Sequence, residues 1–346
     1  MISRRQLTQA LAALTATAAL TSCTPAGPSA TQPQPPPPAT STATASPGNT
    51  PTWGPIKQIK AGVLDIGYAE TGPANGKPVI LLHGWPYDIH SYVDVAPALA
   101  AAGFRVFIPY LRGSGSTTFL SPATTRNGQQ TAVATDIINF MDALGIQRAT
   151  IAGFDWGART ATVLAALWPE RFTGLVSVSG YLITNLKANQ QPLPPAAELG
   201  WWYQYYFATE RGVQGYTRNR AEFNKLIWQT GSPKWHFDDA TYQRTAQSFA
   251  NPDHVAIVVH NYRWRLSLAP GEPQYDALEQ KLAAAPMISI PAITIASDFD
   301  GAAANGAGYR DKFTGRYDHR VLPGIGHNVP QEAPREFTKA VIDVTG

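Results

Sequence analysis

The sequence of 346 residues has few of the features that mark metal-binding, disulfide-bonded or nucleic-acid-binding proteins. It contains one cysteine, Cys23, so no disulfide can form within a single chain. No group of His, Cys and Asp residues has the spacing of metal ligands, and we expect no metal and no cofactor. No dense run of Lys or Arg occurs and the formal net charge is +3, so we expect no nucleic-acid partner.

The apolar run near the start, at residues 11–20, is too short and too rich in Ala and Thr for a membrane-spanning helix. Ser3-Arg4-Arg5 precedes it and Leu20-Thr21-Ser22-Cys23 follows it, which predicts an export signal over residues 1–22. The arginine pair resembles a twin-arginine signal, and the Leu-Thr-Ser-Cys ending resembles a bacterial lipobox. This resemblance implies cleavage before Cys23, lipidation of its thiol and attachment to the cell envelope. A plain secretory signal with an unmodified cysteine stays open as the alternative.

Residues 23–53 are rich in Pro, Thr, Ser and Ala, and they include Pro35-Pro36-Pro37-Pro38. They have no apolar periodicity, so we predict a semi-rigid, disordered tether. Hydrophobic residues make up 44% of the chain and aromatic residues 10%, enough for a substantial core in what remains. The length predicts one large α/β domain with an insertion.

Strands and helices alternate through residues 54–180, the first part of the predicted core. Continuous apolar runs are typical of strands buried in a parallel sheet, and helical spacing separates them. This alternation predicts a mostly parallel sheet with helices on both faces. We expect two edge strands within residues 56–69, central strands at 79–82, 104–108, 149–152 and 175–179, and helices at 91–102, 133–144 and 158–168.

The alternation stops at residues 181–286, which are rich in aromatic residues and helical patterns and show no parallel-strand signal. Residues 287–346 resume the core, with strands expected at 292–296 and 320–322 and a final helix at 332–344. Pockets in such sheets lie at the carboxyl ends of the strands. The late insertion is therefore predicted to be a helical lid over that edge.

Gly153-Phe154-Asp155-Trp156-Gly157 lies between a predicted strand and a predicted helix. This is the setting of a nucleophile elbow, written G-x-S-x-G in hydrolases, whose sharp turn leaves little room for side chains. The raised side chain is here a carboxylate, Asp155. A carboxylate attacks a saturated carbon and forms an ester that water then cleaves. The alternative is that Asp155 only caps the helix.

A carboxylate nucleophile needs a base that activates water and an acid that orients the base. His327 lies on a late glycine-containing turn before a helix, so it is the predicted base, with a structural turn histidine as the alternative. In Ser297-Asp298-Phe299-Asp300, spacing from the preceding strand favours Asp300 as the orienting acid, with Asp298 as the alternative. The order Asp155, Asp300, His327 is the one expected of hydrolases with this architecture.

From about residue 56 to its end, the chain resembles the α/β-hydrolase superfamily. His83-Gly84-Trp85-Pro86 and the elbow are similar to the epoxide hydrolase and haloalkane dehalogenase branch, which uses an Asp nucleophile. The resemblance implies a cis peptide at Trp85-Pro86. It also implies that the backbone N–H groups of Trp85 and Trp156 form an oxyanion hole, which stabilises developing negative charge.

Epoxide hydrolases use two lid tyrosines to protonate the epoxide oxygen. Trp202-Tyr203-Gln204-Tyr205-Tyr206-Phe207 resembles the first tyrosine segment of the family, and Asn261-Tyr262-Arg263 resembles the second. The resemblance implies that Tyr203 and Tyr262 are the donors. Tyr205 and Tyr206 stay open as rivals for the first position, and simple aromatic packing is the alternative for all of them.

Together these patterns predict an exported, lipid-tethered hydrolase. Its predicted substrate is a small apolar molecule whose epoxide is opened to a diol. A haloalkane dehalogenase is the alternative, because Trp156 could donate to a leaving halide, although Trp85 stands where that family more often has Asn or Glu. A haloacetate dehalogenase ranks last, since that family favours Arg directly after the nucleophile and here only Arg159 occurs, further along. A non-catalytic lipoprotein that binds small molecules on the same fold is the alternative of another class.

Overall fold

The computed structural model describes residues 53–303, 306 and 308–346. The predicted export signal, Cys23 and all but the last residue of the predicted tether lie outside the described residues. Within the described part, no helix is both long enough and apolar enough to span a membrane. The strands are β1 Lys57–Ala61, β2 Leu64–Thr71, β3 Lys77–Leu82, β4 Phe104–Pro109, β5 Thr118–Phe119, β6 Ala149–Gly153, β7 Phe172–Val178, β8 Ala292–Ser297 and β9 Tyr317–Leu322.

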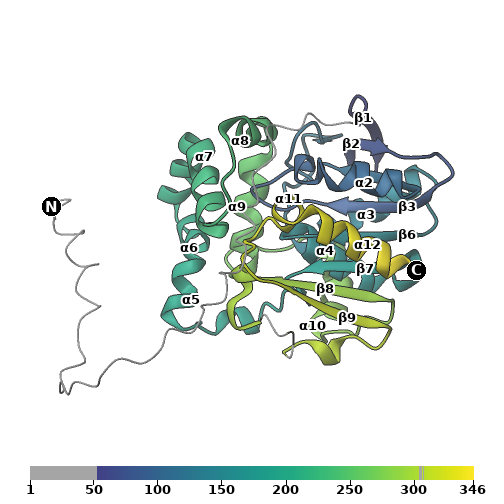
Figure 1. The fold of residues 1–346 in the computed structure, drawn as a ribbon. Helices are drawn as coiled ribbons and strands as arrows, with labels where there is room; N and C mark the ends of the chain where they lie inside the picture. Colours follow the sequence, from purple (N-terminus) through teal and green to yellow (C-terminus); the bar gives the residue numbers. More distant parts are fainter. Residues whose placement is uncertain (1–52, 304–305, 307) are drawn as a thin grey trace, which may run out of the picture. The chain divides into compact units, whose positions relative to one another are not determined.

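Helices pack on both faces of the single sheet that these strands form (Figure 1). On one face α2 and α12 pack against the strands, and on the other face α3 and α4 do. The principal helices are α2 Val95–Ala101, α3 Gln130–Ala143, α4 Trp156–Leu167, α5 Pro195–Gly200, α6 Trp202–Ala208, α7 Glu210–Gly231, α8 Asp239–Ala246, α9 His254–Arg265, α10 Asp276–Ala283, α11 Val329–Glu332 and α12 Pro334–Thr345.

The alternation of side chains along β3 shows how the two layers arise. Ile80 and Leu82 belong to the core that includes α3 and α4, whereas Val79 and Leu81 belong to the core that includes α2 and α12. Successive side chains of a strand point to opposite faces, so a fully apolar strand must be covered on both sides. The continuous apolar runs of the sequence therefore predicted this sandwich correctly, and the predicted fold class is confirmed.

The order of the strands is β1-β2-β4-β3-β6-β7-β8-β9, with β1 and β2 antiparallel to their neighbours and the remaining neighbours parallel. After β3 the chain continues to β4 on one side and later returns to β6 on the other. The loops that leave β3 and β6 therefore diverge and open a crevice at the carboxyl ends of these strands. Leu82 pairs with Gly153 across this point, which places the His83-Gly84-Trp85-Pro86 turn beside the elbow.

The insertion between β7 and β8 carries helices α5 to α10. In Figure 1 α5 to α9 gather beside one end of the sheet as a group of green helices. Helix α10 packs against α4 instead, so the last part of the insertion returns to the layer that covers the sheet. The lid packs directly on the turn after β3. The ring centroid of Trp85 lies 5.3 Å from that of Tyr203, 5.7 Å from that of Phe207 and 6.2 Å from that of Tyr216.

Two details differ from the sequence-based expectation. The helix expected at residues 91–102 is split into a 3-10 turn, Ile89–Tyr92, and the shorter α2, because the side chain of Asp88 caps the first turn at His90 N. Strand β5 was not expected, since two residues are too few to show any periodicity.

Candidate active site

Asp155 lies on the two-residue turn, with Phe154, between the end of β6 and the start of α4. Its backbone has φ 53° and ψ −125°, an unfavourable conformation for a residue with a side chain that costs of the order of 1–3 kcal/mol. The flanking glycines are required by space, since a Cβ at Gly157 would lie 1.9 Å from the carbonyl oxygen of Leu82. Asp155 occupies the N-cap position of α4, but its side chain makes no capping hydrogen bond there, so capping does not account for the carboxylate.

The carboxylate of Asp155 is held at both oxygens. Oδ1 accepts a hydrogen bond from the backbone N–H of Trp85 at 2.7 Å, and Oδ2 lies 3.1 Å from Nε2 of His327. Burial raises the pKa of Asp155, but the hydrogen bond and charge of His327 and the backbone N–H groups of Trp156 and Trp85 outweigh it. The net pKa of Asp155 lies below its ordinary value, so the group is an anion at neutral pH. Both N–H groups expected to form an oxyanion hole thus act on this carboxylate.

The cis peptide implied at Trp85-Pro86 is present, which confirms that expectation. Its turn brings the backbone so close to the elbow that a Cβ at Gly84 would lie 2.3 Å from both Cβ and Oδ1 of Asp155. Only glycine fits at position 84 without displacing the carboxylate.

The lid holds the backbone of His327, since its N–H donates to the carbonyl of Gly231 at 3.1 Å and to Oγ of Ser232 at 2.9 Å. Its imidazole packs against Phe299, with ring centroids 4.2 Å apart. Residue 327 is only 8% exposed, so the imidazole is confined next to Asp155. The structure therefore brings together the predicted nucleophile and the predicted base, which are 172 positions apart in the sequence.

Glu332 organises the turn that carries His327, and sequence reasoning missed it. Its carboxylate accepts from Gly326 N at 2.7 Å, Asn328 N at 3.0 Å and Ser232 Oγ at 2.6 Å. Ser232 in turn receives the backbone N–H of His327, so Glu332 ties the turn to the end of α7. The only sequence signal for this role was that Glu332 follows Asn328 by four residues at the start of a helix.

The structure does not bring the predicted orienting acid to the histidine. The carboxylate of Asp300 accepts a hydrogen bond from the backbone N–H of Ser297 at 2.7 Å. Asp298 is exposed and pairs with Lys234 at 2.6 Å. Nδ1 of His327 is buried and has no hydrogen-bond partner among the described residues. Short polar side chains readily form hydrogen bonds with nearby backbone groups, and Asp300 makes such a local hydrogen bond rather than one to His327.

The rings of Tyr203 on α6 and Tyr262 on α9 pack edge to face, with centroids 5.2 Å apart, close enough to Asp155 for its charge to act on both. The hydroxyl of Tyr262 accepts a hydrogen bond from Nε1 of Trp156 at 3.2 Å. Burial, followed by the charge of Asp155, raises the pKa of Tyr203. Burial, with Tyr203 and Asp155, also raises the pKa of Tyr262. Both phenols are therefore protonated at neutral pH and able to donate a proton.

The two rival tyrosines lie elsewhere. Tyr205 is 49% exposed, and its hydroxyl donates to Glu198 on the surface of the lid. Tyr206 stacks on Phe223, with ring centroids 5.6 Å apart. Of the three tyrosines in the first segment, only Tyr203 packs against Tyr262.

A buried hydrogen-bonded chain supports the ring of Trp85. Nε1 of Trp85 donates to the hydroxyl of Tyr216 at 2.8 Å, and that hydroxyl lies 2.9 Å from Nε2 of His254. Nδ1 of His254 lies 2.8 Å from the carbonyl of Gly113, which can only accept, so Nδ1 carries the proton. Nε2 then accepts from Tyr216, and every member of the chain is satisfied with a neutral His254.

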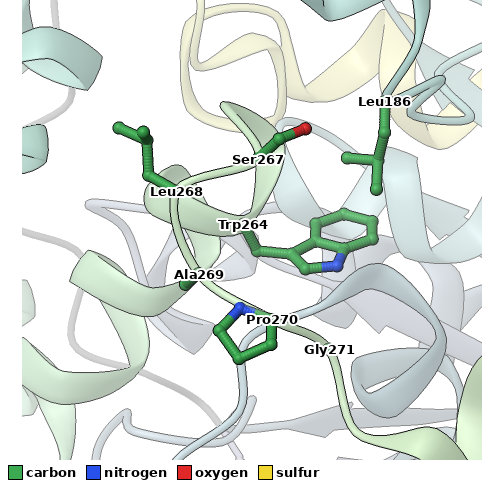
Figure 2. A pocket seen from close by; sticks show the side chains of 7 residues that line it. All are labelled: Leu186, Trp264, Ser267, Leu268, Ala269, Pro270 and Gly271. Atoms are coloured by element: carbon green, nitrogen blue, oxygen red, sulfur yellow. The ribbon is translucent and has the colours of Figure 1, made fainter.

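Neither described cavity is a large active-site chamber. A cavity of about 20 Å³ adjoins the turn after β3 and is lined in part by Trp85, Tyr87 and Trp156. A surface hollow of about 420 Å³ is lined by Trp264, Leu186 and the loop after α9, and none of the residues described above lines it (Figure 2). Among the described residues no group of three or more His, Cys, Asp or Glu could hold a metal ion.

Comparison with known proteins extends these observations. Residues 77–334 match the family described as alpha/beta hydrolase fold. A candidate epoxide hydrolase from Klebsiella pneumoniae is 57% identical, and its crystal structure matches with a TM-score of 0.82 over 84% of this chain and 97% of that one.

Two curated relatives match over shorter stretches. Epoxide hydrolase B from Mycobacterium tuberculosis is 32% identical over 150 residues, which are 40% of this chain and 42% of that protein. A haloalkane dehalogenase from Mycolicibacterium paratuberculosis is 30% identical over 210 residues, which are 58% of this chain and 66% of that protein. This chain thus spans about two fifths of the length of the Mycobacterium tuberculosis protein.

We expect Gly84→Ala to lower the free energy of unfolding by about 1–3 kcal/mol, because the new methyl group overlaps the Asp155 side chain. Chemical denaturation of the purified variant measures this. Gly200→Ala is the matched control, since a Cβ there meets nothing within 4 Å. Equal stability of the two variants would contradict the close approach of the two turns.

His254 should make stability depend on pH. Burial lowers the pKa of His254 to about 4, below the ordinary value of about 6.5. Between these values the unfolded chain binds a proton that the native chain does not, so the free energy of unfolding falls as the pH is lowered. From pH 7 to pH 4 the wild type should lose about 3 kcal/mol more than His254→Gln.

Denaturation at each pH tests this expectation. The exposed His236→Gln is the control and should follow the wild-type curve. Parallel curves for wild type and His254→Gln would show that His254 is not buried in neutral form.

Proposed function

Because this chain belongs to the alpha/beta hydrolase family and is a hydrolase, we propose that it opens epoxides to diols through an ester on Asp155. The observation that carries the proposal is the pair of protonated tyrosines, Tyr203 and Tyr262, which pack together beside the indole of Trp156. An opening epoxide generates an alkoxide, which needs a proton donor at that position.

The first step follows from the two oxygens of Asp155. Oδ2 attacks an epoxide carbon and the carbon–oxygen bond breaks, while Tyr203 or Tyr262 transfers its proton to the departing oxygen. Oδ1, held by Trp85 N–H, becomes the carbonyl oxygen of the resulting ester. Trp156 Nε1 donates to the hydroxyl oxygen of Tyr262, so that hydroxyl acts as acceptor for the indole and keeps its own proton for transfer.

The second step releases the product. His327 takes a proton from water, whose oxygen adds to the ester carbonyl, and the N–H groups of Trp85 and Trp156 stabilise the negative charge on Oδ1. Collapse of this intermediate frees the diol and restores the carboxylate, and the proton on His327 returns to the tyrosinate. The sum is epoxide plus water to diol. The role of Asp300 as the orienting acid stays a prediction. It requires the carboxylate to rotate from the Ser297 N–H toward Nδ1 of His327.

Haloalkane hydrolysis is the competing chemistry, and the indole groups argue against it. A leaving halide needs free N–H donors near the nucleophile. Nε1 of Trp156 donates to Tyr262, and Nε1 of Trp85 donates to Tyr216. Both indole donors of the site are therefore engaged by tyrosines of the lid.

We expect His327→Gln to accumulate the ester, because attack by Asp155 proceeds while activation of water is lost. Incubation with a panel of epoxides and haloalkanes, followed by intact-mass measurement, should show a gain equal to the mass of an epoxide. Peptide mapping should place it on Asp155, and the double variant with Asp155→Asn should stay unmodified. Binding without an adduct or product from any member of the panel would instead favour the non-catalytic alternative.

Tyr262→Phe tests the proton donor. It should lower kcat for diol formation by about 10²-fold or more, the usual scale of general acid catalysis, while leaving the fold intact. Tyr205→Phe, on the surface of the same lid, is the matched control and should keep the wild-type rate. A double Tyr203→Phe, Tyr262→Phe variant with undiminished turnover would overturn the assignment of these residues, and halide release by it would favour dehalogenation.

A further inference from the structure

Two arginines lie beside the candidate site without a role in the chemistry described above. Arg159 follows Asp155 by four residues on α4, and Arg265 follows Tyr262 by three residues on α9. Residues three or four apart share one face of a helix. Arg265 therefore shares a face of α9 with Tyr262, and Arg159 lies in the first turn of α4, directly after the elbow; one arginine comes from the lid and the other from the core.

Neither guanidinium has an acidic partner. Every Asp and Glu of the sequence belongs to the described part of the chain, and none of them lies within 4.0 Å of Arg159 or Arg265 among the ion pairs found there. Arg159 donates only to neutral oxygens, the carbonyl of Leu182 at 3.3 Å and Oγ1 of Thr184 at 3.5 Å. Arg265 is 8% exposed, and its buried Nε has no hydrogen-bond partner among the described residues.

Aromatic rings surround the Arg265 guanidinium instead. Its central carbon lies 5.5 Å from the ring centroid of Tyr262 and 5.9 Å from that of Trp201. Contacts with aromatic faces offset only part of the cost of taking a cation out of water. The guanidinium therefore keeps at least one unused hydrogen-bond donor, Nε, beside these rings.

The two positive charges act on each other and on the site. Burial, followed by repulsion from Arg265, lowers the pKa of Arg159 to about 10, whereas Asp155, Tyr262 and Tyr203 act in the opposite direction. The charge of Arg265 also opposes part of the burial-driven rise in the pKa of Tyr203 and of Tyr262. Both guanidiniums are thus electrostatically coupled to the residues around the nucleophile.

Arg112 shows what this chain does with a buried arginine that has a structural role. Arg112 is 3% exposed, comparable to Arg265, and its guanidinium donates to both carboxylate oxygens of Asp136, at 2.6 and 2.7 Å. A buried charge without such a partner is strongly destabilising. The lack of any carboxylate at Arg159 and Arg265 therefore indicates that their counterion comes from outside the chain.

We infer that Arg159 and Arg265 form an anion subsite, and that the substrate is a small epoxide carrying a carboxylate. This inference rests on the proposed function for the epoxide, and on the two unpaired guanidiniums for the carboxylate. The planar guanidinium binds a carboxylate through two parallel hydrogen bonds. A monoanion suits the aromatic surroundings better than a phosphate dianion, which loses more solvation on burial.

The helix sets the distance between the two groups of the substrate. The backbone N–H of Arg159 donates to the carbonyl oxygen of Asp155 at 3.1 Å, so Arg159 lies about one helical turn, roughly 5 Å, beyond the elbow. An epoxide with its carboxylate a few bonds away spans this length. The subsite would thus hold the epoxide carbon against Oδ2 of Asp155.

A matched pair of substrates tests the inference: a terminal epoxide bearing a carboxylate and its primary amide, which has the same size and no charge. The wild-type chain should have a kcat/KM at least tenfold higher for the acid, mainly through KM. Arg265→Gln should reduce this preference at least tenfold, and Arg265→Lys should restore part of it. Arg263→Gln, on the same helix but paired with Glu210 near the surface, is the control and should keep the wild-type preference.

Other outcomes separate the alternatives. An equal loss on acid and amide in Arg265→Gln would mean that the guanidinium serves only the tyrosines, and would overturn the subsite. Turnover of the amide without preference for the acid would also overturn it, while the proposed function stood. If no epoxide is consumed, the proposed function fails. Calorimetry with propanoate then decides the subsite, which needs binding by the wild type and loss of binding in Arg265→Gln.

Discussion

The sharp turn at Asp155 is the constraint on which the rest of the site depends. A residue with a side chain is held at positive φ between a strand and a helix, and its carboxylate projects away from the sheet. Glycines at 84, 153 and 157 leave the room that the turn needs. The strain is offset because two separate parts of the chain grip the carboxylate, the Trp85 N–H at one oxygen and His327 at the other.

The lid covers the site and also supplies residues that hold its catalytic groups in place. Gly231 and Ser232, at the end of α7, hold the backbone of His327, and Glu332 ties the same turn from the other side. Tyr262 engages the indole of Trp156, and Tyr216 engages that of Trp85. The contacts that pack the lid on the core thus position the proposed proton donor, Tyr262. They also occupy the two indole N–H groups that a leaving halide would need. The unpaired Arg159 and Arg265 fit this arrangement as a place for the charged end of a substrate.

Several parts of the site were predictable because they depend on local pattern. The elbow needs a strand, small residues and a helix in direct succession, so Asp155 stood out, and His327 stood out from its late glycine turn. Asp300 was chosen by spacing alone, and the expected contact with His327 is absent because a nearby backbone N–H engages the carboxylate. Spacing along a strand end determines which residue is near, but the rotation of its side chain depends on local competition for hydrogen bonds.

By itself the sequence determined the layered sheet, the position of the insertion and the identity of the raised carboxylate, since each follows from periodicity or from contiguous residues. Only the tertiary structure decided which lid tyrosine faces the nucleophile, how Glu332 and Tyr216 support the turns, and which arginines lack a partner. These features join residues far apart in the sequence, such as Trp85 and Tyr216, which are 131 positions apart. No local pattern encodes such contacts, because they depend on how the whole lid settles on the carboxyl ends of the strands.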